Sequence, residues 1–521
     1  MPVTLTYPGV YVEELESGVR TIAGVATSIT AFIGRAARGP VGDPITITSF
    51  GDFERTFGGL WEPSTLGFAV RDFFQNGGNR GIVVRLYVEG NKNATASIDA
   101  NGLTLDAASP GSWGSALRAR VDHDVAEVVA KSYGLQTTDL FNLTVRDTKT
   151  GVTEQFRNLT IAASPRVADK VLANESELVL VSGPMNAVPG AHANPAPGED
   201  IWKLDSLSSP VDQEGDDGDP LAKEAFLGGQ NDTFQTDKKG LYALEHADLF
   251  NLLCIPPYKD GNAEQDVLEP ATTYCEDRRA MLILDSPVEW TTPKKAIDNV
   301  DDFGSSKNAA LFFPRLHRPN PLHDNQVEDF AACGAMAGIM ARTDTERGVW
   351  KAPAGLAATI VGAPALSVQL TDAEIGLLNP LGINCLRRAP AAGRVVWGAR
   401  TRQGDDRLAS EWKYIPVRRT ALYIEESLFR GTQWVVFEPN DESLWAQIRL
   451  NVGAFMHDLF RQGAFQGTTP QDAYLVKCDA ETTTQNDINL GVVNILVGFA
   501  PLKPAEFVVL KIQQLAGQVE V

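Results

Sequence analysis

The chain has 521 residues, with 46 basic and 66 acidic side chains that give a net charge of −20. Hydrophobic residues make up 43% of it, which is enough for a substantial core and excludes a largely disordered protein. The acidic balance argues against a nucleic-acid partner, because binding to phosphates needs a basic face. Five scattered cysteines without a CxxC pair indicate buried thiols in a reducing compartment, and neither a disulfide framework nor a zinc site.

The first 22 residues read as an extended arm without the basic and apolar regions of a signal peptide. Pro2 and Pro8 oppose a helix, whereas Val10, Tyr11 and Val12 begin an alternating, strand-like pattern. One short strand cannot hold itself and needs a sheet to join. The longest uncharged run, residues 352–371, carries proline and glycine and is a poor membrane span. We therefore expect that the chain does not insert into a membrane and that it is made in a cytoplasm.

Residues 23–90 alternate between strand and helix patterns, which is typical of a layered α/β domain. Residues 25–33 and 81–88 are expected strands, and Ser49 is the expected cap of a helix that contains Phe53 and Phe57. Residues 66–74 add a second helical stripe.

The sequence pattern changes over residues 91–225, where short strand-like segments dominate. Within this segment, residues 182–220 are rich in Pro, Gly and Asp. This segment holds 11 basic and 20 acidic residues, a net charge of −9. We expect an inserted, mainly β outer domain with a long solvent-facing loop.

The α/β pattern resumes from residue 226. Residues 249–255, 280–284 and 308–314 are continuous apolar runs of the kind expected of strands covered on both faces. Residues 330–341 form an Ala- and Gly-rich helix suited to close packing on a sheet. Residues 23–90 and 226–376 therefore make one discontinuous middle domain.

Residues 377–503 make an α+β C-terminal domain. Its expected elements are a helix over 417–428, a strand over 434–437, and a long helix to Gly463 that begins after Asn440 or Asp441. Two strands, 473–478 and 491–499, follow. Residues 504–521 form a terminal arm whose extended part, 506–512, places Val508, Leu510 and Ile512 on one face.

Several sequence blocks in this order carry a resemblance to a known family. Near the N-terminus they are PGVYVEE, ATSITAFIGRAARGP, FGDFERTFGG and FFQNGGNRGIVVR; further on they are TDTERGVWKAPAG, LNPLGINCLRR, VVWGART, WVVFEPND and APLKPAEFVV. The chain resembles the sheath proteins of contractile phage tails and of related contractile injection systems. The resemblance does not cover residues 91–225, and GGQND (residues 228–232) departs from the family's usual GG-x-DG turn.

The resemblance implies a structural protein that forms hexameric rings, stacked helically around an inner tube, whose contraction drives that tube through a target envelope. The implied partners are further copies, the inner tube protein, and baseplate and terminal cap proteins. The particle would assemble in the bacterial cytoplasm as a virion tail, a tailocin or an injection device. Inter-subunit strands would come from both arms: Val10, Tyr11, Val12, Phe507, Val508, Val509, Leu510 and Ile512. Residues 15–22 and 501–504 would be flexible connectors.

Three alternatives stand beside this interpretation. The family's middle domain is described as subtilisin-like, but none of the six histidines lies in a GxSxG or HExxH motif, and P-loop and GxGxxG motifs are absent. We therefore expect no catalytic residue, cofactor or metal, and we expect Asp122, His123 and Asp124 to form a solvated loop. A non-contractile surface filament is the second alternative. The third is a surface-binding role for residues 91–225, against which simple decoration is favoured.

The long C-terminal helix has a second face with Arg449, His457 and Arg461. This face is a candidate contact with an acidic patch of the inner tube, and an ordinary solvated face is an equally good interpretation. Arg400, in the GARTR run, is expected to form a structural salt bridge.

Overall fold

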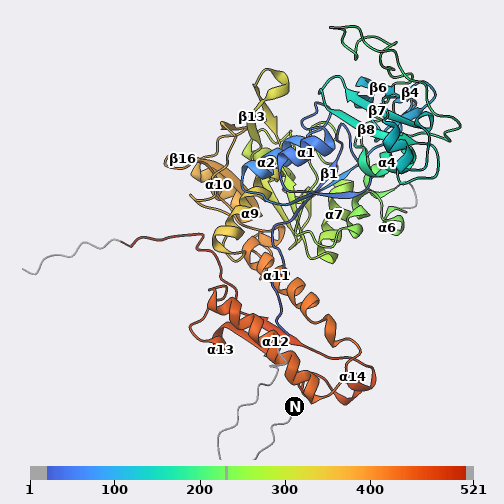
Figure 1. Ribbon diagram of the computed structural model, residues 1–521. Helices are drawn as coiled ribbons and strands as arrows, with labels where there is room; N and C mark the ends of the chain where they lie inside the picture. The colour runs from blue at the N-terminus through green and yellow to red at the C-terminus, as the bar shows by residue number, and fades with distance from the viewer. Residues whose placement is uncertain (1–19, 229–232, 512–521) are drawn as a thin grey trace, which may run out of the picture. The chain divides into compact units, whose positions relative to one another are not determined.

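The computed structural model describes residues 20–228 and 233–511, and these fall into two compact units (Figure 1). The large unit comprises Ser28–Arg342 and Ala354–Ala409. The C-terminal unit comprises residues up to Thr27, Thr343–Pro353 and residues from Ser410 onward. Both contain helices and strands, so the expected α/β class is confirmed.

The large unit is built on an eight-stranded sheet in the order β17-β16-β12-β11-β10-β1-β3-β2. Its six inner strands are parallel, and β2 and β17 close the two edges in antiparallel pairing. Burial on both faces explains why the inner strands read as apolar runs. The bounds are β1 (Thr30–Gly34), β2 (Pro44–Ile47), β3 (Gly81–Arg85), β10 (Leu252–Cys254), β11 (Met281–Asp285), β12 (Ala309–Phe313), β16 (Ile383–Ala389) and β17 (Gly393–Val396).

Some helices of this unit begin at a residue whose side chain caps them. Ser49 accepts a hydrogen bond from the Asp52 amide at the start of α1, as expected, and Phe53 and Phe57 are buried. The main helices are α1 (Phe50–Phe57), α2 (Leu66–Gln75), α7 (Gln265–Asp277), α8 (Pro293–Asn299), α9 (Cys333–Arg347) and α10 (Asp372–Leu378).

Helix α9 packs very closely against α2. A Cβ atom on Gly334 would lie 2.0 Å from the Ala69 carbonyl oxygen, and one on Gly338 would lie 2.4 Å from the Phe73 carbonyl oxygen. The expected close approach is therefore to a neighbouring helix. The helix also begins later than expected, because residues up to Phe330 form β14 (Gln326–Phe330), which pairs with β13 (Leu316–Asn320).

The domain boundary expected at residue 377 is wrong. Ile383 pairs with Leu311 in parallel register, and Ile383 and Leu386 are completely buried. Strands β16 and β17 therefore extend the large sheet, and the C-terminal unit resumes at Ser410.

The inserted segment has its own hydrophobic core, formed by buried side chains between Ala96 and Val179. Figure 1 shows its strands β4, β6, β7 and β8 gathered with α4, away from β16 and α10 of the same unit. The Asp219 amide donates to the Val88 carbonyl at 3.0 Å, so the two linkers that join it to the sheet lie side by side. Its elements are β4 (Ser97–Asp99), β5 (Thr104–Ala107), β9 (Val179–Val181), β6 (Leu117–Asp122), β7 (Leu140–Asp147), β8 (Thr153–Thr160), α3 (Glu127–Ser132) and α4 (Ala168–Glu175).

From Ser410 onward, the described part of the C-terminal unit contains two long helices, two short α-helices and a small hairpin. Asp441 caps the second long helix by accepting from the Leu444 amide, as expected. The elements are α11 (Ile415–Gly431), α12 (Glu442–Arg461), α13 (Pro470–Ala473), β18 (Tyr474–Lys477), α14 (Gln485–Asn489) and β19 (Leu496–Phe499).

The strand expected over residues 434–437 is wrong, because residues Gln433–Val435 form a 3₁₀ turn and Phe437 has a φ of 71°. No helix in the described ranges is long and apolar enough to cross a membrane. All five cysteines are free and buried, as expected.

Candidate assembly interface

The hairpin β18–β19 is a two-stranded sheet whose outer edges pair with no further strand in the described part of the chain. Tyr474 and Phe499 form one end of its register, and Lys477 and Leu496 form the other. One face packs on the core of the C-terminal unit, while Leu475 is 53% and Leu496 51% exposed. Isolated two-stranded sheets are marginally stable in water, and open edges are templates for a further strand.

The chain that follows β19 leaves the hairpin without folding back on it. Pro501 makes a single bridge to Phe465, and the Tyr414 hydroxyl donates to the Glu506 carboxylate at 3.2 Å. Residues 502–511 form no regular secondary structure. The predicted arm residues Phe507, Val508, Val509 and Leu510 are 74–80% exposed, and Ile512 lies outside the described residues. Four consecutive exposed apolar side chains are unusual on the surface of a soluble protein that binds no partner there.

Val10, Tyr11 and Val12 of the N-terminal arm also lie outside the described residues, but the base of this arm is well defined. The Arg20 amide donates to the buried Asn451 side chain at 3.0 Å, and the Arg20 guanidinium lies 4.5 Å from the centre of the Trp434 ring. Ile22 is 6% exposed and sits over Gly431 of α11. The connector expected to be flexible over 15–22 is therefore fixed at residues 20–22.

A buried ion pair continues this attachment. Asp344 near the end of α9 accepts from both Arg419 of α11 and the Thr27 hydroxyl, at 2.6 and 2.7 Å, and Arg419 also donates to the Thr27 carbonyl. Both charged side chains are less than 5% exposed. Burial raises the pKa of Asp344, against the pull of Arg419 in the opposite direction. Sequence analysis missed this pair, because a charged residue on a helix gives no sign of its distant partner.

The three residues proposed to contact a tube do not form one free basic face. Arg449 donates to the Glu442 carboxylate at 2.6 Å and to the Cys478 carbonyl. His457 contacts the Tyr474 hydroxyl through its Nδ1 at 3.2 Å. Arg461, in the last turn of α12, is exposed. Of the three, Arg461 offers the charge that is least engaged within the described chain.

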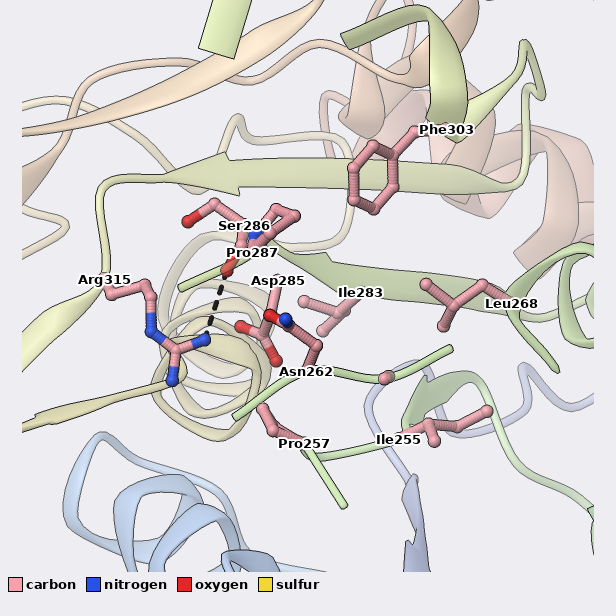
Figure 2. A pocket seen from close by; sticks show the side chains of 11 residues that line it. Ile255, Pro257, Asn262, Leu268, Ile283, Asp285, Ser286, Pro287, Phe303 and Arg315 are labelled. Atoms are coloured by element: carbon pink, nitrogen blue, oxygen red, sulfur yellow. Dashed lines mark hydrogen bonds between the residues drawn. The ribbon is translucent and has the colours of Figure 1, made fainter. Parts of the chain in front are cut away.

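The carboxyl edge of the large sheet is the place where an α/β enzyme would carry its chemistry. Figure 2 shows Asp285, at the end of β11, facing Arg315 across a small cavity that Phe303, Leu268 and Ile283 line from the other side. Asp285 accepts from the amides of Ala332 and Cys333, at the start of α9. The Arg315 guanidinium donates to the Ser286 carbonyl at 3.1 Å and to Asp329 at 2.8 Å.

This cluster is unsuited to a substrate. The cavity measures about 20 Å³, room for roughly one water molecule, whereas small-molecule sites measure about 300–1,000 Å³. Burial raises the pKa of Asp285, and the pKa of the neighbouring Cys333 thiol is raised by hydrogen bonding and burial. A buried, protonated thiol is a poor nucleophile. The arrangement therefore closes the start of α9 onto the sheet.

A larger apolar hollow of about 520 Å³ lies beside residues 86–88, which follow β3, and among the described residues that line it Glu224 and Lys239 are the charged ones. His123 contacts the Pro189 carbonyl, and Asp122 accepts from Asn142 and the Asp124 amide, so these polar groups are engaged in a turn. The searched residues, 20–228 and 233–511, contain no His, Cys, Asp and Glu cluster that could hold a metal ion.

Arg400 forms the expected structural salt bridge. It is 1% exposed, pairs with Asp406 at 3.1 Å and donates to the carbonyls of Asn379 and Gly404.

Two parts of the chain match models of known protein domains. Residues 250–402 match the phage tail sheath protein central domain, and residues 409–514 match the phage tail sheath C-terminal domain. A prophage major tail sheath protein of Pseudomonas aeruginosa (strain UCBPP-PA14) is 26% identical over 279 residues, which is 52% of this chain and 67% of that protein. These matches indicate a structural subunit of a tail sheath. The chain is thus similar to phage tail sheath proteins, and residues 250–402 and 409–514 carry the similarity to their central and C-terminal domains.

Solved structures agree with this fold. The helical sheath of the anti-feeding prophage in its contracted state is 23% identical, with a TM-score of 0.56, and the match covers 98% of this chain and 100% of that one. A chain of the sixfold-symmetrised baseplate of the same particle is 21% identical, with a TM-score of 0.56 and the same coverage. At this identity the likeness establishes the fold alone.

Proposed function

We propose that this sheath subunit polymerises as stacked hexameric rings around an inner tube, and that the stack shortens to drive the tube through a target envelope. The observation that carries the proposal is the combination of an open-edged hairpin, β18–β19, with an exposed apolar tail at residues 507–510. Within the described part of one copy, the hairpin edge has no partner strand and the apolar tail is exposed. Another copy would pair with the edge and bury the tail.

The tail would add to an edge of the hairpin as a further strand. In such β-augmentation, main-chain hydrogen bonds supply affinity and alternate side chains set the register. Four residues of pairing would contribute about 2–6 kcal/mol per tail, at roughly 0.5–1.5 kcal/mol for each hydrogen bond. This is modest for one copy, and it becomes strong only when every copy in a lattice is tied in the same way.

The N-terminal arm would act as a second strand donor through Val10, Tyr11 and Val12. The firm attachment of residues 20–27 supports this role, because an arm pulled by a neighbour needs a fixed base. Sliding and rotation of the copies during contraction would leave the strand pairing intact.

Further partners follow from the relatives. The sixfold baseplate and the contracted sheath of the anti-feeding prophage support ring formation and a baseplate contact for this chain. An inner tube and a terminal cap would complete the particle. The α12 face with Arg449, His457 and Arg461 would contact the tube chiefly through Arg461. The particle would assemble in the bacterial cytoplasm as part of a virion tail, a tailocin or an injection device.

The role would be mechanical, without catalysis, cofactor or metal. The small cavity beside Asp285 supports this view, since it has no room for a substrate. The insert would decorate the outer surface of the particle. A non-contractile filament would use the same strand exchange, and no specific feature of the chain favours it.

The proposal is tested by comparing the full-length chain with the doubly substituted Val508→Asp, Leu510→Asp chain. Full-length protein is expected to form tubes that pellet and are visible by negative-stain electron microscopy, and the variant is expected to remain as small species with an unchanged thermal unfolding midpoint. The matched control is Val152→Asp, an exposed valine of the insert, which should polymerise normally. Normal tubes from the doubly substituted chain would refute strand exchange by the tail.

A further inference from the structure

Phe437 is the most exposed large hydrophobic residue of the described chain, with a relative exposure of 102%. Its φ of 71° lies in the left-handed region, which is unfavourable for a bulky side chain. Strain of this kind persists only where the surroundings hold it. A strained backbone that points a phenyl ring into solvent destabilises the single copy, because within that copy the exposed ring buries no surface to offset the strain.

The surroundings do hold this loop in place. The Val435 and Glu438 amides donate to the Thr432 and Val435 carbonyls, which closes two tight turns around Phe437. Beyond it, Asn440 accepts from the Trp445 indole at 2.8 Å and donates to the Val492 carbonyl at 3.0 Å. The loop after α11 is therefore tied to the loop before β19.

This tie joins the two loops that carry four exposed apolar residues, which together we call the Phe437 patch. Its members are Val436 (59% exposed), Phe437 (102%), Leu490 (69%) and Val492 (40%). Glu438 borders it and is exposed, and its side-chain carboxylate makes no hydrogen bond or ion pair with any described residue. The patch thus offers an apolar centre with an unpaired negative charge at its rim.

One segment of the chain has the complementary chemistry. Residues 507–510 are apolar and exposed, and Lys511 follows them directly. A phenyl-lined patch with an acidic rim matches such a segment in both hydrophobicity and charge.

The tail that docks there must come from another copy. Within one chain, Glu506 is held by Tyr414 at the start of α11, whereas the Phe437 patch lies past the end of that helix. The 17 residues of α11 separate the two points by about 25 Å. The tail also leaves the hairpin at its Phe499 end, opposite to the Leu496 end that is closer to Val492.

We propose that the Phe437 patch is a docking point for residues 507–511 of another copy, with the Lys511 ammonium beside the Glu438 carboxylate. This inference rests on the tail exchange proposed above. Val492 lies four residues before Leu496, no more than about 14 Å along the chain. Seven extended residues, 505–511, span up to about 23 Å, so one tail can follow the hairpin and reach the patch.

The first test is a disulfide between two single variants of the full-length chain, Phe437→Cys and Val508→Cys. The native cysteines are buried, so each variant offers one accessible thiol. Mixed polymers of the two variants are expected to give a covalent dimer on mild oxidation, while neither variant alone does so. Val152→Cys mixed with Val508→Cys is the control and should give none. Cross-linking of Phe437→Cys only to itself, or only to a co-assembled inner tube protein, would overturn the proposal.

The second test uses Phe437→Gly, because glycine adopts a φ of 71° without strain. The monomer's unfolding midpoint should stay the same or rise, while the critical concentration for polymerisation rises at least about tenfold. Glu438→Lys and Lys511→Glu should each weaken polymerisation, and the two together should restore it.

The two proposals fail in different ways. If polymerisation needs the tail but Phe437→Gly assembles like the wild type, the Phe437 patch is not the docking point and strand exchange stands. If the Val508→Asp, Leu510→Asp chain also assembles normally, tail exchange itself is wrong.

Discussion

At the scale of single residues, the ion pair between Asp344 and Arg419 fixes the base of the N-terminal arm. Its two side chains are almost fully buried, and both also bond to Thr27. Removing one partner of a buried pair leaves an uncompensated charge, which is why such changes cost more than the pair itself contributes. The pair therefore holds the arm base to α11.

We expect Asp344→Asn to lower the free energy of unfolding by about 3–5 kcal/mol, because Arg419 keeps its charge without a carboxylate partner. Urea denaturation of the C-terminal unit, followed by tryptophan fluorescence, measures this loss. Glu127→Gln breaks the exposed pair with Lys131, whose side chains are both 71% exposed, and should cost less than about 0.5 kcal/mol. Equal losses of unfolding free energy in the two variants would show that the buried pair stabilises the protein no more than the exposed pair does.

His323 gives the large unit a pH-dependent contact. Its Nδ1 lies 2.6 Å from Glu328 and its Nε2 lies 3.4 Å from Glu62. Hydrogen bonding to Glu328 is the main cause that raises the pKa of His323. Since the folded pKa exceeds the unfolded value of about 6.5, the contact stabilises fully below that pH and is lost as pH rises through the folded pKa.

We therefore expect His323→Gln to lower the thermal unfolding midpoint at about pH 5.5 and to leave it unchanged at about pH 9. Differential scanning calorimetry of both chains at the two pH values measures the difference. A midpoint difference of the same size at both pH values would mean that the charge of His323 plays no part.

The structural role of a residue could be predicted from the sequence where the role depends on near neighbours in the chain, and it could not where the partner is distant. Ser49 could be assigned as a cap, and Asp441 was one of two candidates with Asn440, because a cap acts within three residues of its own position. The partners Asp344 and Arg419 are 75 positions apart, and the sequence does not encode that distance in any local pattern. Phe437 was taken as part of a strand because Val435 and Val436 favour one. The Pro439-Asn440-Asp441 run was the available sign of a turn.

At the scale of elements, the contact between α2 and α9 depends on small residues. Gly334 has no room for a Cβ, because the nearest atom would be a backbone carbonyl oxygen at 2.0 Å. Gly376, in α10, has nothing within 4 Å of the same position. The two glycines therefore allow a matched comparison of packing against intrinsic helix propensity.

We expect Gly334→Ala to destabilise the large unit by about 1–3 kcal/mol, since the helices must move apart. Gly376→Ala should instead stabilise it by about 0.5–1 kcal/mol, because alanine favours the helix and restricts the unfolded chain. Thermal unfolding midpoints of the two variants decide the matter. Stabilisation by both would contradict the close helix contact.

Elements were predictable where burial fixed their pattern. The apolar runs that became β10, β11 and β12 were recognised because inner parallel strands are covered on both faces. Strands β16 and β17 were given to the wrong domain, because a strand's sequence does not say which sheet it joins. The hairpin β18–β19 was recognised as two strands, but its open edges became evident only from the fold.

At the scale of the whole molecule, we expect that the insert, residues 91–225, can be deleted without loss of the remaining fold. Its core is its own, and its two linkers meet where the Asp219 amide donates to the Val88 carbonyl. Replacement of residues 90–218 by a short Gly-Ser linker is therefore expected to leave folding and polymerisation intact, with thinner tubes seen by electron microscopy. A shortened chain that folds but forms no tubes would give the insert a role in assembly.

The central claim is that copies of this chain are joined by exchanged terminal strands. A cryo-electron microscopy reconstruction of the polymer formed by the full-length chain tests it most directly. We expect residues 505–511 of one copy to run as a strand along the β18–β19 hairpin of another. A polymer in which those residues lie on their own copy, with neighbours meeting only through side chains, would contradict it.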